Sequence, residues 1–421
     1  MPRPTLIVLG TGFAAFSLIK AIDTTQYDVV VVSPRNHFLF TPLLPSTTVG
    51  TLEFRSIIEP IRAARPEVQF YQSLCTAVVP EEKKIQCEGA IDKRTFELRY
   101  DILVIAVGAA VNTYGISGVR EYALFLKELS DARAIRQKII ECFEQASQPS
   151  VSDGERKRLL HFVVVGGGPT GVEFAAEMND FLQGDLRRSY PMLFNDVRIT
   201  VLEAGEHILN TFDAALSDYT TRMFQRQHIE VRTGSFVQRV DKEVILLGDA
   251  SQIPYGLMVW STGIGAREFI KALSFEKDGA SRILTDDFFL VKSTQNVFAL
   301  GDCAVVEEKN FPATAQVAQQ EGKYLARSLG KKARGKRVRP FRYKHYGMLA
   351  YVGSNRALAD LSTVKGKGFS AWLFWRSAYL TKLVSFKNKV LVIFDWFKTF
   401  VFGRDISRFL THEHRILNIE H

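Results

Sequence analysis

The sequence predicts an α/β protein with two similar nucleotide-binding domains and a C-terminal region of different character. Two segments, LIVLGTGFAAFS (6–17) and LLHFVVVGGGPTGVEFAAEM (159–178), each lead from an apolar strand through a glycine-rich turn into a helix. A third segment (369–405) is rich in aromatic residues and lysine. A chain of 421 residues, 46% hydrophobic and 24% charged, can form two or three globular domains. We therefore expect two Rossmann-like domains and an amphipathic C-terminal region.

The first turn has glycine where a dinucleotide site needs it. Gly10 permits the tight turn after the strand, and Gly12 leaves room for backbone N–H groups to approach a diphosphate. Ala15 is small enough for the helix to pack closely on the strand. Glycine-rich turns also occur for packing alone, but the second copy about 155 residues later favours a dinucleotide site.

The strand YDVVVV (27–32) ends at Ser33, where many dinucleotide domains have an acid that binds a ribose. We expect the hydroxyl of Ser33 and the backbone near Pro34 to hold an adenosine ribose, with Arg35 near the diphosphate. An ordinary exit from strand to loop is the alternative.

An apolar loop with two prolines, NHFLFTPLLP (36–45), comes next. Its rigid, extended path predicts that it lies under something flat and hydrophobic, such as an isoalloxazine ring. Thr41 and, at the end of the strand DILVIAVG, Gly108 are assigned to the same cofactor. A packing loop without a ligand is the alternative.

The second turn places Gly166, Gly168 and Gly171 at GxGxxG spacing. The following strand ends in Glu203, which can accept both ribose hydroxyls of NADH and repel the 2′-phosphate of NADPH. About 30 residues separate Gly171 from Glu203, more than the usual spacing of about 20, which a longer helix explains. A second small-residue turn at Thr262 and Gly263 ends this domain.

Four polar residues remain as candidates for chemistry. Glu173 lies just inside the second helix, where the helix dipole alone could account for an acid. Asp302, in the segment ALGDCA, follows an apolar strand and could accept a ribityl hydroxyl. In AQVAQQ (315–320), Gln316 and Gln320 share one helix face, with Ala315 leaving space beside them. A small-residue packing helix is the alternative.

The cysteines suggest neither a zinc site nor a redox disulfide. Cys75, Cys87, Cys142 and Cys303 form no CxxC pair, and we expect reduced thiols and no metal. The N-terminus shows neither a signal peptide nor a transit peptide, and the first strand is expected to begin by residue 5.

Positive charge gathers near the C-terminus. Residues 331–408 contain 18 Lys and Arg and three acids, a net charge of +15. The whole chain has a net charge of +9, so the remaining residues sum to −6. Aromatic and leucine residues recur in 369–405 at steps of three and four, interspersed with lysine, but Asp395 and Lys398 interrupt the longest apolar run. We expect helices lying in the headgroup plane of an anionic bilayer, with a dimer interface as the alternative. No RNA platform or basic recognition helix is evident, so nucleic acid is not expected as a partner.

Together the two fingerprints, FLFTPLLP, GDCA, AQVAQQ and the tail segments YGMLAYVGSNRALADL (346–361) and 375–405 resemble the type II, or alternative, NADH:quinone oxidoreductases. These are single-subunit flavoproteins with two dinucleotide-binding domains. The resemblance extends through nearly the whole chain.

The resemblance implies FAD at Gly10, Gly12, Ala15 and Asp302, and NADH at Gly166, Gly168, Gly171 and Glu203. It places Glu173 near the nicotinamide and makes Gln316 and Gln320 quinone-site glutamines. Ser33 in place of an acid is not unusual in this family. The implied reaction is non-proton-pumping, ping-pong transfer from NADH through FAD to ubiquinone or menaquinone.

The expected domains follow from this assignment. Residues 1–113 and 286–335 would bind FAD, 114–285 would bind NADH, and 336–421 would contact the membrane and form a homodimer. The expected location is the cytoplasmic face of a bacterial membrane, or the mitochondrial inner membrane if a transit peptide has been removed.

Two other classes of function remain open on the sequence alone. One is a flavin reductase with another acceptor, although residues 36–50 contain no cysteine for disulfide or peroxide reduction. The other is a non-catalytic, NADH-sensing flavoprotein.

Overall fold

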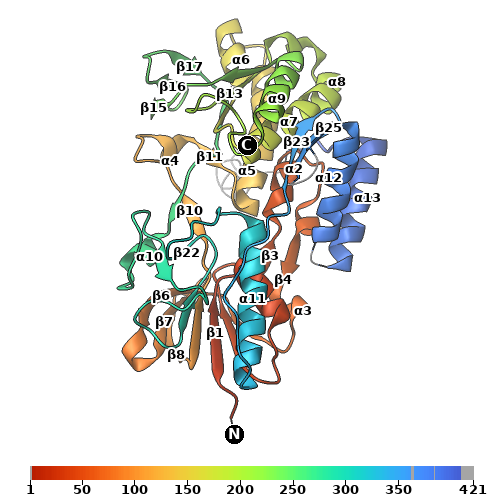
Figure 1. Ribbon diagram of the computed structural model, residues 1–421. Helices are drawn as coiled ribbons and strands as arrows, with labels where there is room; N and C mark the ends of the chain where they lie inside the picture. The colour runs from red at the N-terminus through yellow and green to blue at the C-terminus, as the bar shows by residue number, and fades with distance from the viewer. Residues whose placement is uncertain (1, 362–364, 384, 409–421) are drawn as a thin grey trace. The chain divides into compact units, whose positions relative to one another are not determined.

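The computed structural model describes residues 2–361, 365–383 and 385–408, which fall into two compact units (Figure 1). Unit 1 consists of Met1–Phe40, Ile58–Val111 and Ile264–His345. Unit 2 consists of Thr41–Ile57, Asn112–Gly263 and Tyr346–His421. Residues 264–285 and 336–345 therefore belong to unit 1, and 41–57 to unit 2, which differs from the boundaries expected from the sequence. Residues 409–421 of the expected membrane region lie outside the described residues.

Unit 1 is built on a five-stranded parallel sheet in the order β21-β9-β1-β2-β5. Its strands are β1 (Thr5–Leu9), β2 (Asp28–Val32), β5 (Gln69–Tyr71), β9 (Ile102–Ile105) and β21 (Val297–Ala299). The central strands are apolar along their length because a parallel sheet is covered on both faces.

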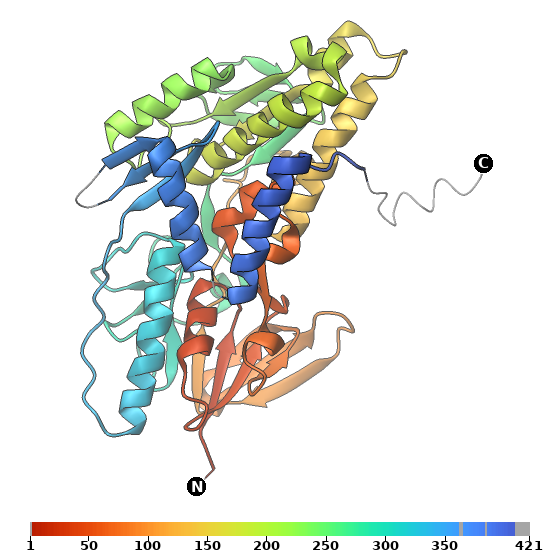
Figure 2. The same ribbon diagram turned by 90° about the vertical axis from the view of Figure 1, so that its right-hand side faces the viewer.

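Two helices of unit 1 pack against each other, α1 (Phe13–Ala21) and α11 (Ala315–Ala333). Figure 2 shows α11 as the long cyan helix of this unit. A Cβ on Gly322 would lie 2.1 Å from the carbonyl oxygen of Ala14, so a glycine is needed where the helices approach.

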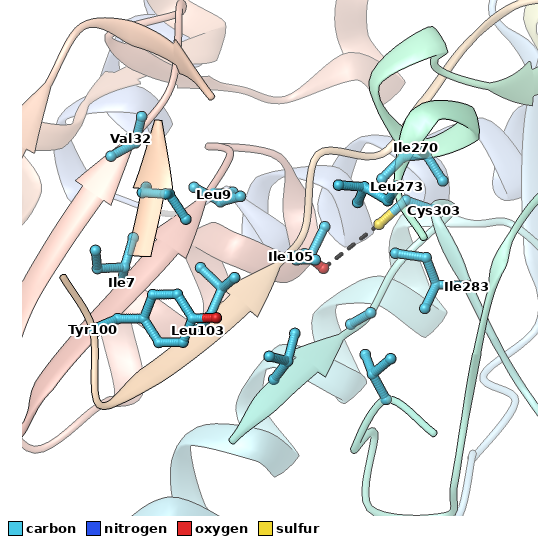
Figure 3. Packing of buried hydrophobic residues seen from close by; sticks show 14 of the residues in the cluster. Ile7, Leu9, Val32, Tyr100, Leu103, Ile105, Ile270, Leu273, Ile283 and Cys303 are labelled. Carbon is cyan, nitrogen blue, oxygen red and sulfur yellow. Dashed lines mark hydrogen bonds between the residues drawn. The ribbon is translucent and has the colours of Figure 1, made fainter. Parts of the chain in front are cut away.

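The core of unit 1 lies between its parallel sheet and a smaller antiparallel sheet. The smaller sheet has the order β6-β7-β8, with β6 (Ser73–Val79), β7 (Lys84–Gly89) and β8 (Thr95–Arg99). Ile7 and Leu9 of β1 pack in one cluster with Ile85 and Cys87 of β7. Figure 3 shows part of this cluster, in which the Cys303 thiol donates to the carbonyl of Ile105 at 3.5 Å.

Short elements complete unit 1. They are β3 (His37–Leu39) paired with β4 (Ile58–Pro60), β10 (Ala109–Val111) with β19 (Ile264–Ala266), β20 (Ile283–Thr285) with β22 (Ala304–Val306), the helices α3 (Ile61–Ala64) and α10 (Glu268–Ala272), and the 3₁₀ turn η3 (Pro80–Glu82).

Unit 2 contains a second five-stranded parallel sheet, in the order β11-β18-β12-β13-β14. Its strands are β11 (Leu124–Phe125), β12 (His161–Val165), β13 (Arg198–Leu202), β14 (Ile229–Arg232) and β18 (Leu257–Trp260). An antiparallel sheet of β15 (Val237–Val240), β16 (Val244–Leu247) and β17 (Gln252–Pro254) accompanies it.

The helices of the central part of unit 2 follow the alternation of strand and helix that the sequence predicts. They are α2 (Leu44–Thr48), α4 (Val119–Tyr122), α5 (Leu129–Ala146), α6 (Asp153–Leu159), α7 (Pro169–Phe181), α8 (Arg187–Ser189) and α9 (Ala214–Arg226). Shorter turns are η1 (Thr41–Leu43), η2 (Phe54–Ile57), the π-helical η4 (Leu182–Leu186) and η5 (Pro191–Asp196).

The C-terminal part of unit 2 is a three-stranded antiparallel sheet followed by two helices. The strands are β23 (Met348–Gly353), β24 (Arg356–Asp360) and β25 (Lys365–Gly368), and the helices are α12 (Phe369–Lys382) and α13 (Phe386–Phe402). Strand β23 packs against α7. Figure 2 shows α12 and α13, both blue, beside each other. Within the described ranges no helix is long and apolar enough to cross a membrane.

Candidate functional site

The first glycine-rich turn joins β1 to α1 in unit 1. Gly10 has a φ of +107°, and a Cβ there would lie 2.4 Å from the carbonyl oxygen of Ala106, so only glycine fits. A Cβ on Gly12, the residue before α1, would meet nothing within 4 Å. This space beside the backbone N–H groups of a helix N-terminus fits a diphosphate. Ala15 is fully buried, which lets α1 lie close to the sheet.

Ser33 lies at the end of β2 and is 4% exposed. Its Oγ lies 3.2 Å from Oγ1 of Thr11 and accepts the N–H of Arg35 at 3.2 Å. Arg35 donates through Nε to the carbonyl of His37, whereas Pro34 is exposed. These bonds tie the glycine turn to the end of β2, the position where such folds hold a ribose.

Asp302 follows β21 at the carboxyl edge of the same parallel sheet. The preceding Gly301, at a φ of +76°, donates its N–H to Oε2 of Glu321 at 2.6 Å. Glu321 is 6% exposed, and its burial raises the pKa of the carboxyl to about 7. Asp302, Glu321 and Thr314 line one pocket at the start of α11.

Sequence reasoning missed Glu321, although it directly follows the glutamines of AQVAQQ. The available signal was its place on the helix face that carries Ala318 and Leu325, both buried. An acid on a buried helix face needs a partner, and the Gly301 turn supplies one.

Two further residues assigned to FAD occupy different units. Gly108 follows β9 in unit 1 with a φ of +66°, and a Cβ there would meet nothing within 4 Å. Thr41 begins η1 and belongs to unit 2. The assignment of Thr41 to FAD therefore stays a prediction.

The two glutamines of α11 contact the segment that follows the helix. Oε1 of Gln316 accepts the hydroxyl of Tyr343 at 2.8 Å, and that hydroxyl lies 3.0 Å from Nδ1 of His345. Gln320 donates through Nε2 to the carbonyl of Lys344 at 2.8 Å and accepts its N–H at 3.0 Å. Ala315 is the first residue of the helix. Gln320 thus holds the backbone of this segment, and Tyr343 holds the amide of Gln316.

The second glycine-rich turn, in unit 2, repeats the geometry of the first. Gly166 has a φ of +111°, and a Cβ there would lie 2.8 Å from Cβ of Thr262. A Cβ on Gly171 would lie 1.9 Å from the carbonyl oxygen of Gly166, so α7 packs directly on the turn. Gly168 precedes α7, and a Cβ there would meet nothing within 4 Å, as at the first turn.

Glu203 directly follows β13 and is oriented by backbone groups. Its Oε2 accepts the N–H of Gly167 at 2.6 Å, and its Oε1 accepts the N–H of Gly205 at 2.7 Å. Each carboxylate oxygen retains a second lone pair for a ribose hydroxyl. The acid is thus fixed beside the glycine turn, as a nicotinamide dinucleotide requires.

Thr262 and Gly263 follow β18 at the same edge of this sheet. Gly263 has a φ of +73° and accepts the N–H of Asn112 at 3.2 Å. The indole of Trp260 donates to the carbonyl of Asn112 at 3.1 Å. The small-residue turn is thus held rigidly next to Gly166.

Glu173 is on α7 and is 6% exposed. Its Oε1 accepts the backbone N–H of Tyr351 at 3.1 Å and the indole N–H of Trp375 at 3.3 Å. Burial is the largest influence on this carboxyl and raises its pKa to about 8. Burial thus favours the protonated form of this carboxyl, and contacts from the C-terminal segment hold the side chain in place.

Two more acids follow on the same face of α7 and were not anticipated. Glu177 accepts the hydroxyls of Ser46 at 2.7 Å and Thr51 at 2.8 Å. Asp180 accepts the hydroxyl of Tyr351, and burial raises the pKa of its carboxyl to about 6. Only the spacing of four and seven residues from Glu173 indicated that they share its face.

The structure thus brings the expected residues together at one sheet edge in each unit. Gly10, Gly12, Ser33, Gly108 and Asp302 share the carboxyl edge of the first parallel sheet. Gly166, Gly168, Glu203, Thr262 and Gly263 share that edge of the second. Ligands of doubly wound sheets bind at such edges, and the open glycine cradles fit FAD and NADH. In the part of the chain that the structure describes, no cluster of His, Cys, Asp or Glu could hold a metal ion.

Two family models match the chain. The pyridine nucleotide-disulphide oxidoreductase model matches residues 4–322, and the NDH2 C-terminal domain model matches residues 345–405. The first spans both glycine-rich turns, and the second spans β23 to α13.

Relatives of known name and structure are similar over nearly the whole chain. A probable NADH dehydrogenase of Dictyostelium discoideum is 50% identical over 410 residues, covering 96% of this chain and 91% of the relative. The mitochondrial internal alternative NAD(P)H-ubiquinone oxidoreductase A1 of Arabidopsis thaliana is 43% identical, covering 96% and 86%. The structure of NDH2 from Plasmodium falciparum in complex with NADH is 30% identical with a TM-score of 0.92, covering 96% and 100%. The chain therefore belongs to the type II, or alternative, NADH dehydrogenase family within the pyridine nucleotide-disulphide oxidoreductases.

Proposed function

We propose that this protein is an NADH:quinone oxidoreductase that holds FAD in unit 1 and NADH in unit 2. The observation that carries the proposal is the pair of glycine-rich turns from strand to helix in one chain, each with open space beside its second glycine. When bound, FAD accepts a hydride from NADH and passes two electrons to a quinone. Quinone as the acceptor is supported by the family and by relatives named ubiquinone oxidoreductases.

The residues of each crevice have distinct tasks in this proposal. Gly10 and Gly12 admit a diphosphate, and Asp302 binds a ribityl hydroxyl. Glu203 binds the adenosine ribose of NADH and disfavours NADPH. Glu173, neutral at pH 7, can donate a hydrogen bond to the nicotinamide carboxamide without placing a charge near it. Gln316, whose amide oxygen accepts the hydroxyl of Tyr343, is the residue that we assign to a quinone carbonyl.

Anaerobic stopped-flow measurements of the two half-reactions test the function and the role of Gln316. In the wild-type chain, NADH should bleach the flavin absorbance and a soluble quinone should restore it. In Gln316→Ala the quinone step should slow about fivefold, the effect of one lost hydrogen bond worth ~1 kcal/mol, while bleaching by NADH is unchanged.

Lys323→Ala, an exposed change on the same helix, is the control and should leave both steps unaffected. Bleaching without recovery in the wild-type chain would instead support a reductase with another acceptor or an NADH sensor. An equal loss of both steps in Gln316→Ala would show that the glutamine is structural.

Glu203→Gln should reduce the preference for NADH over NADPH by about one order of magnitude, because it removes a charge that repels the 2′-phosphate. The measurement is the ratio of kcat/KM for the two nucleotides. Glu203→Asp disturbs the bonds to Gly167 and Gly205 but retains the charge, so it should preserve most of the preference. A similar fall in both variants would contradict the proposed repulsion.

The raised pKa of Glu173 predicts how stability depends on pH. The carboxyl is neutral up to about pH 8 in the folded chain but ionises near its ordinary value of 4.5 when unfolded. Its favourable contribution is therefore complete below 4.5 and is lost as the pH rises through 8. Glutamine cannot ionise, so the Tm of Glu173→Gln relative to wild type should increase between pH 5 and pH 9.

Glu177→Gln provides the comparison on the same helix face. Glu177 accepts two hydroxyls and lies 3.8 Å from the guanidinium of Arg404, so its loss of charge should lower the Tm. A constant Tm difference for Glu173→Gln across the pH range would show that the pKa of Glu173 is not raised in the folded chain.

We further propose that α12 and α13 dock on a bilayer surface. Phe386, Phe400 and Phe402 are 82%, 89% and 81% exposed, and Phe394 and Phe397 are more than half exposed. Exposed aromatic residues at this density are typical of an interface with lipid or protein. The mitochondrial names of several relatives favour the mitochondrial inner membrane over a bacterial membrane. The homodimer expected from the sequence stays a prediction.

Vesicle sedimentation with phosphatidylcholine containing anionic lipid tests this docking. The double change Phe386→Ser and Phe400→Ser should abolish binding to the vesicles and leave the flavin content unchanged. Truncation is unsuitable, because β23 and α12 also cover Glu173. Met192→Ser, a similarly exposed position at 89%, is the control. Loss of dimers in sedimentation velocity with vesicle binding retained would assign this surface to a second copy instead.

A further inference from the structure

Cys75 and Cys87 lie opposite each other although the sequence separates them by a turn. Both are free thiols, Cys75 in β6 and Cys87 in β7. They are register partners in the antiparallel pairing of these strands. Residues directly opposite in a sheet point to the same face, so the two thiols are neighbours.

The hydrogen bonds around the pair show which kind of position it occupies. The N–H of Ala90 donates to the carbonyl of Gln72 at 3.0 Å, which makes Gln72 and Ala90 a hydrogen-bonded pair. At the next pair, the N–H of Ser73 donates to Ser33 and that of Gly89 to Arg94, so neither donates across to the other strand. Hydrogen-bonded and non-hydrogen-bonded pairs alternate along an antiparallel ladder.

Cys75 and Cys87 are two residues further along the ladder than Ser73 and Gly89, so they also form a non-hydrogen-bonded pair. Opposed Cα atoms at such positions lie about 4.5 Å apart, inside the range of roughly 4.4–6.8 Å that disulfides span. A bulge between Cys75 and Ala77 lets the strand adjust beside the pair. The backbone is therefore already arranged for an S–S bond.

The two thiols have different environments. Cys87 is 1% exposed and packs in the core of unit 1, whereas Cys75 is partly exposed. Their mutual hydrogen bond lowers the pKa of the Cys87 thiol and, together with burial, raises that of Cys75. Solvent therefore reaches Cys75, and the thiol beside it ionises more readily.

We propose that Cys75 and Cys87 are a redox modification site that forms a reversible disulfide when the protein meets hydrogen peroxide. As the sulfur of Cys75 attacks one peroxide oxygen, its proton passes to the neighbouring Cys87 thiolate, an S–O bond forms and the O–O bond breaks. The leaving hydroxide takes that proton from Cys87 and becomes water. The Cys87 thiolate then attacks the oxidised sulfur, forming the S–S bond while the S–O bond breaks and a second water leaves. Two thiols lose two electrons and two protons, and peroxide is reduced to two waters.

The site adjoins the FAD crevice. Ser73, two residues before Cys75, donates its N–H to the carbonyl of Ser33 at 3.1 Å, and Ser33 donates its own N–H to Tyr71 at 3.2 Å. A disulfide would cross-link β6 and β7 beside the strand end where the ribose is expected. This inference depends on the fold of unit 1 and not on the identity of the electron acceptor.

The test uses the full-length, FAD-loaded protein treated with hydrogen peroxide, then denatured and alkylated with N-ethylmaleimide. Intact mass should show four alkylated thiols before oxidation, two after it, and four again after reduction with dithiothreitol. Peptide mapping should find a cross-link between the segments that contain Cys75 and Cys87. Four alkylated thiols after oxidation, or oxygen added to Cys75 without a cross-link, would overturn the proposal.

Two variants identify the partners. Cys75→Ser changes a partly exposed residue, and its oxidised form should contain no intramolecular disulfide. Cys142→Ser, in α5 of unit 2, should still lose two alkylatable thiols on oxidation. A disulfide in Cys75→Ser, or none in Cys142→Ser, would contradict the pairing, and the wild-type peptide map decides it independently of both variants.

Discussion

Three buried acids on α7 need hydrogen-bond partners, and this requirement determines which segments of the chain pack in unit 2. Glu173, Glu177 and Asp180 lie on one helix face, and burying a carboxyl group is costly unless it is hydrogen-bonded or protonated. Their partners come from two segments far away in the sequence, residues 41–57 and residues 346–404. This explains why both segments belong to unit 2. The C-terminal segment is thus part of the interior of unit 2 as well as of its surface.

The glycine-rich turns could be predicted from the sequence because their requirements are local. At Gly10 and Gly166 the backbone has a positive φ and a Cβ would meet a close neighbour, so glycine is required. Both conditions follow from a strand that turns directly into a helix. The environment of Glu173 could not be predicted, since Tyr351, 178 residues away, supplies its hydrogen bond. The opposition of Cys75 and Cys87 depends on strand register, which no residue spacing in the sequence specifies.

The two parallel sheets differ in the charge of the residue that follows their second strand. In unit 1 the end of β2 offers the hydroxyls of Ser33 and Thr11, which bind each other and hold the turn. In unit 2 the end of β13 offers Glu203, fixed by two backbone N–H groups. A fixed acid repels a 2′-phosphate, which a neutral hydroxyl does not.

Two charged residues of the C-terminal helices α12 and α13 are packed against other residues of the protein, which the sequence pattern of these helices does not indicate. Arg376 lies between the rings of Trp372 and Trp396, at 4.1 Å and 4.4 Å from their centroids. Asp395, which interrupts the apolar run, accepts the hydroxyl of Ser56 and is buried. Arg376 thus joins α12 to α13, and Asp395 and Lys398 attach α13 to Ser56 and Glu53, while many exposed side chains of these helices are aromatic. Docking on a membrane would then use apolar area and exposed lysines such as Lys387 but not Arg376, because a cation held between two rings cannot also reach a headgroup.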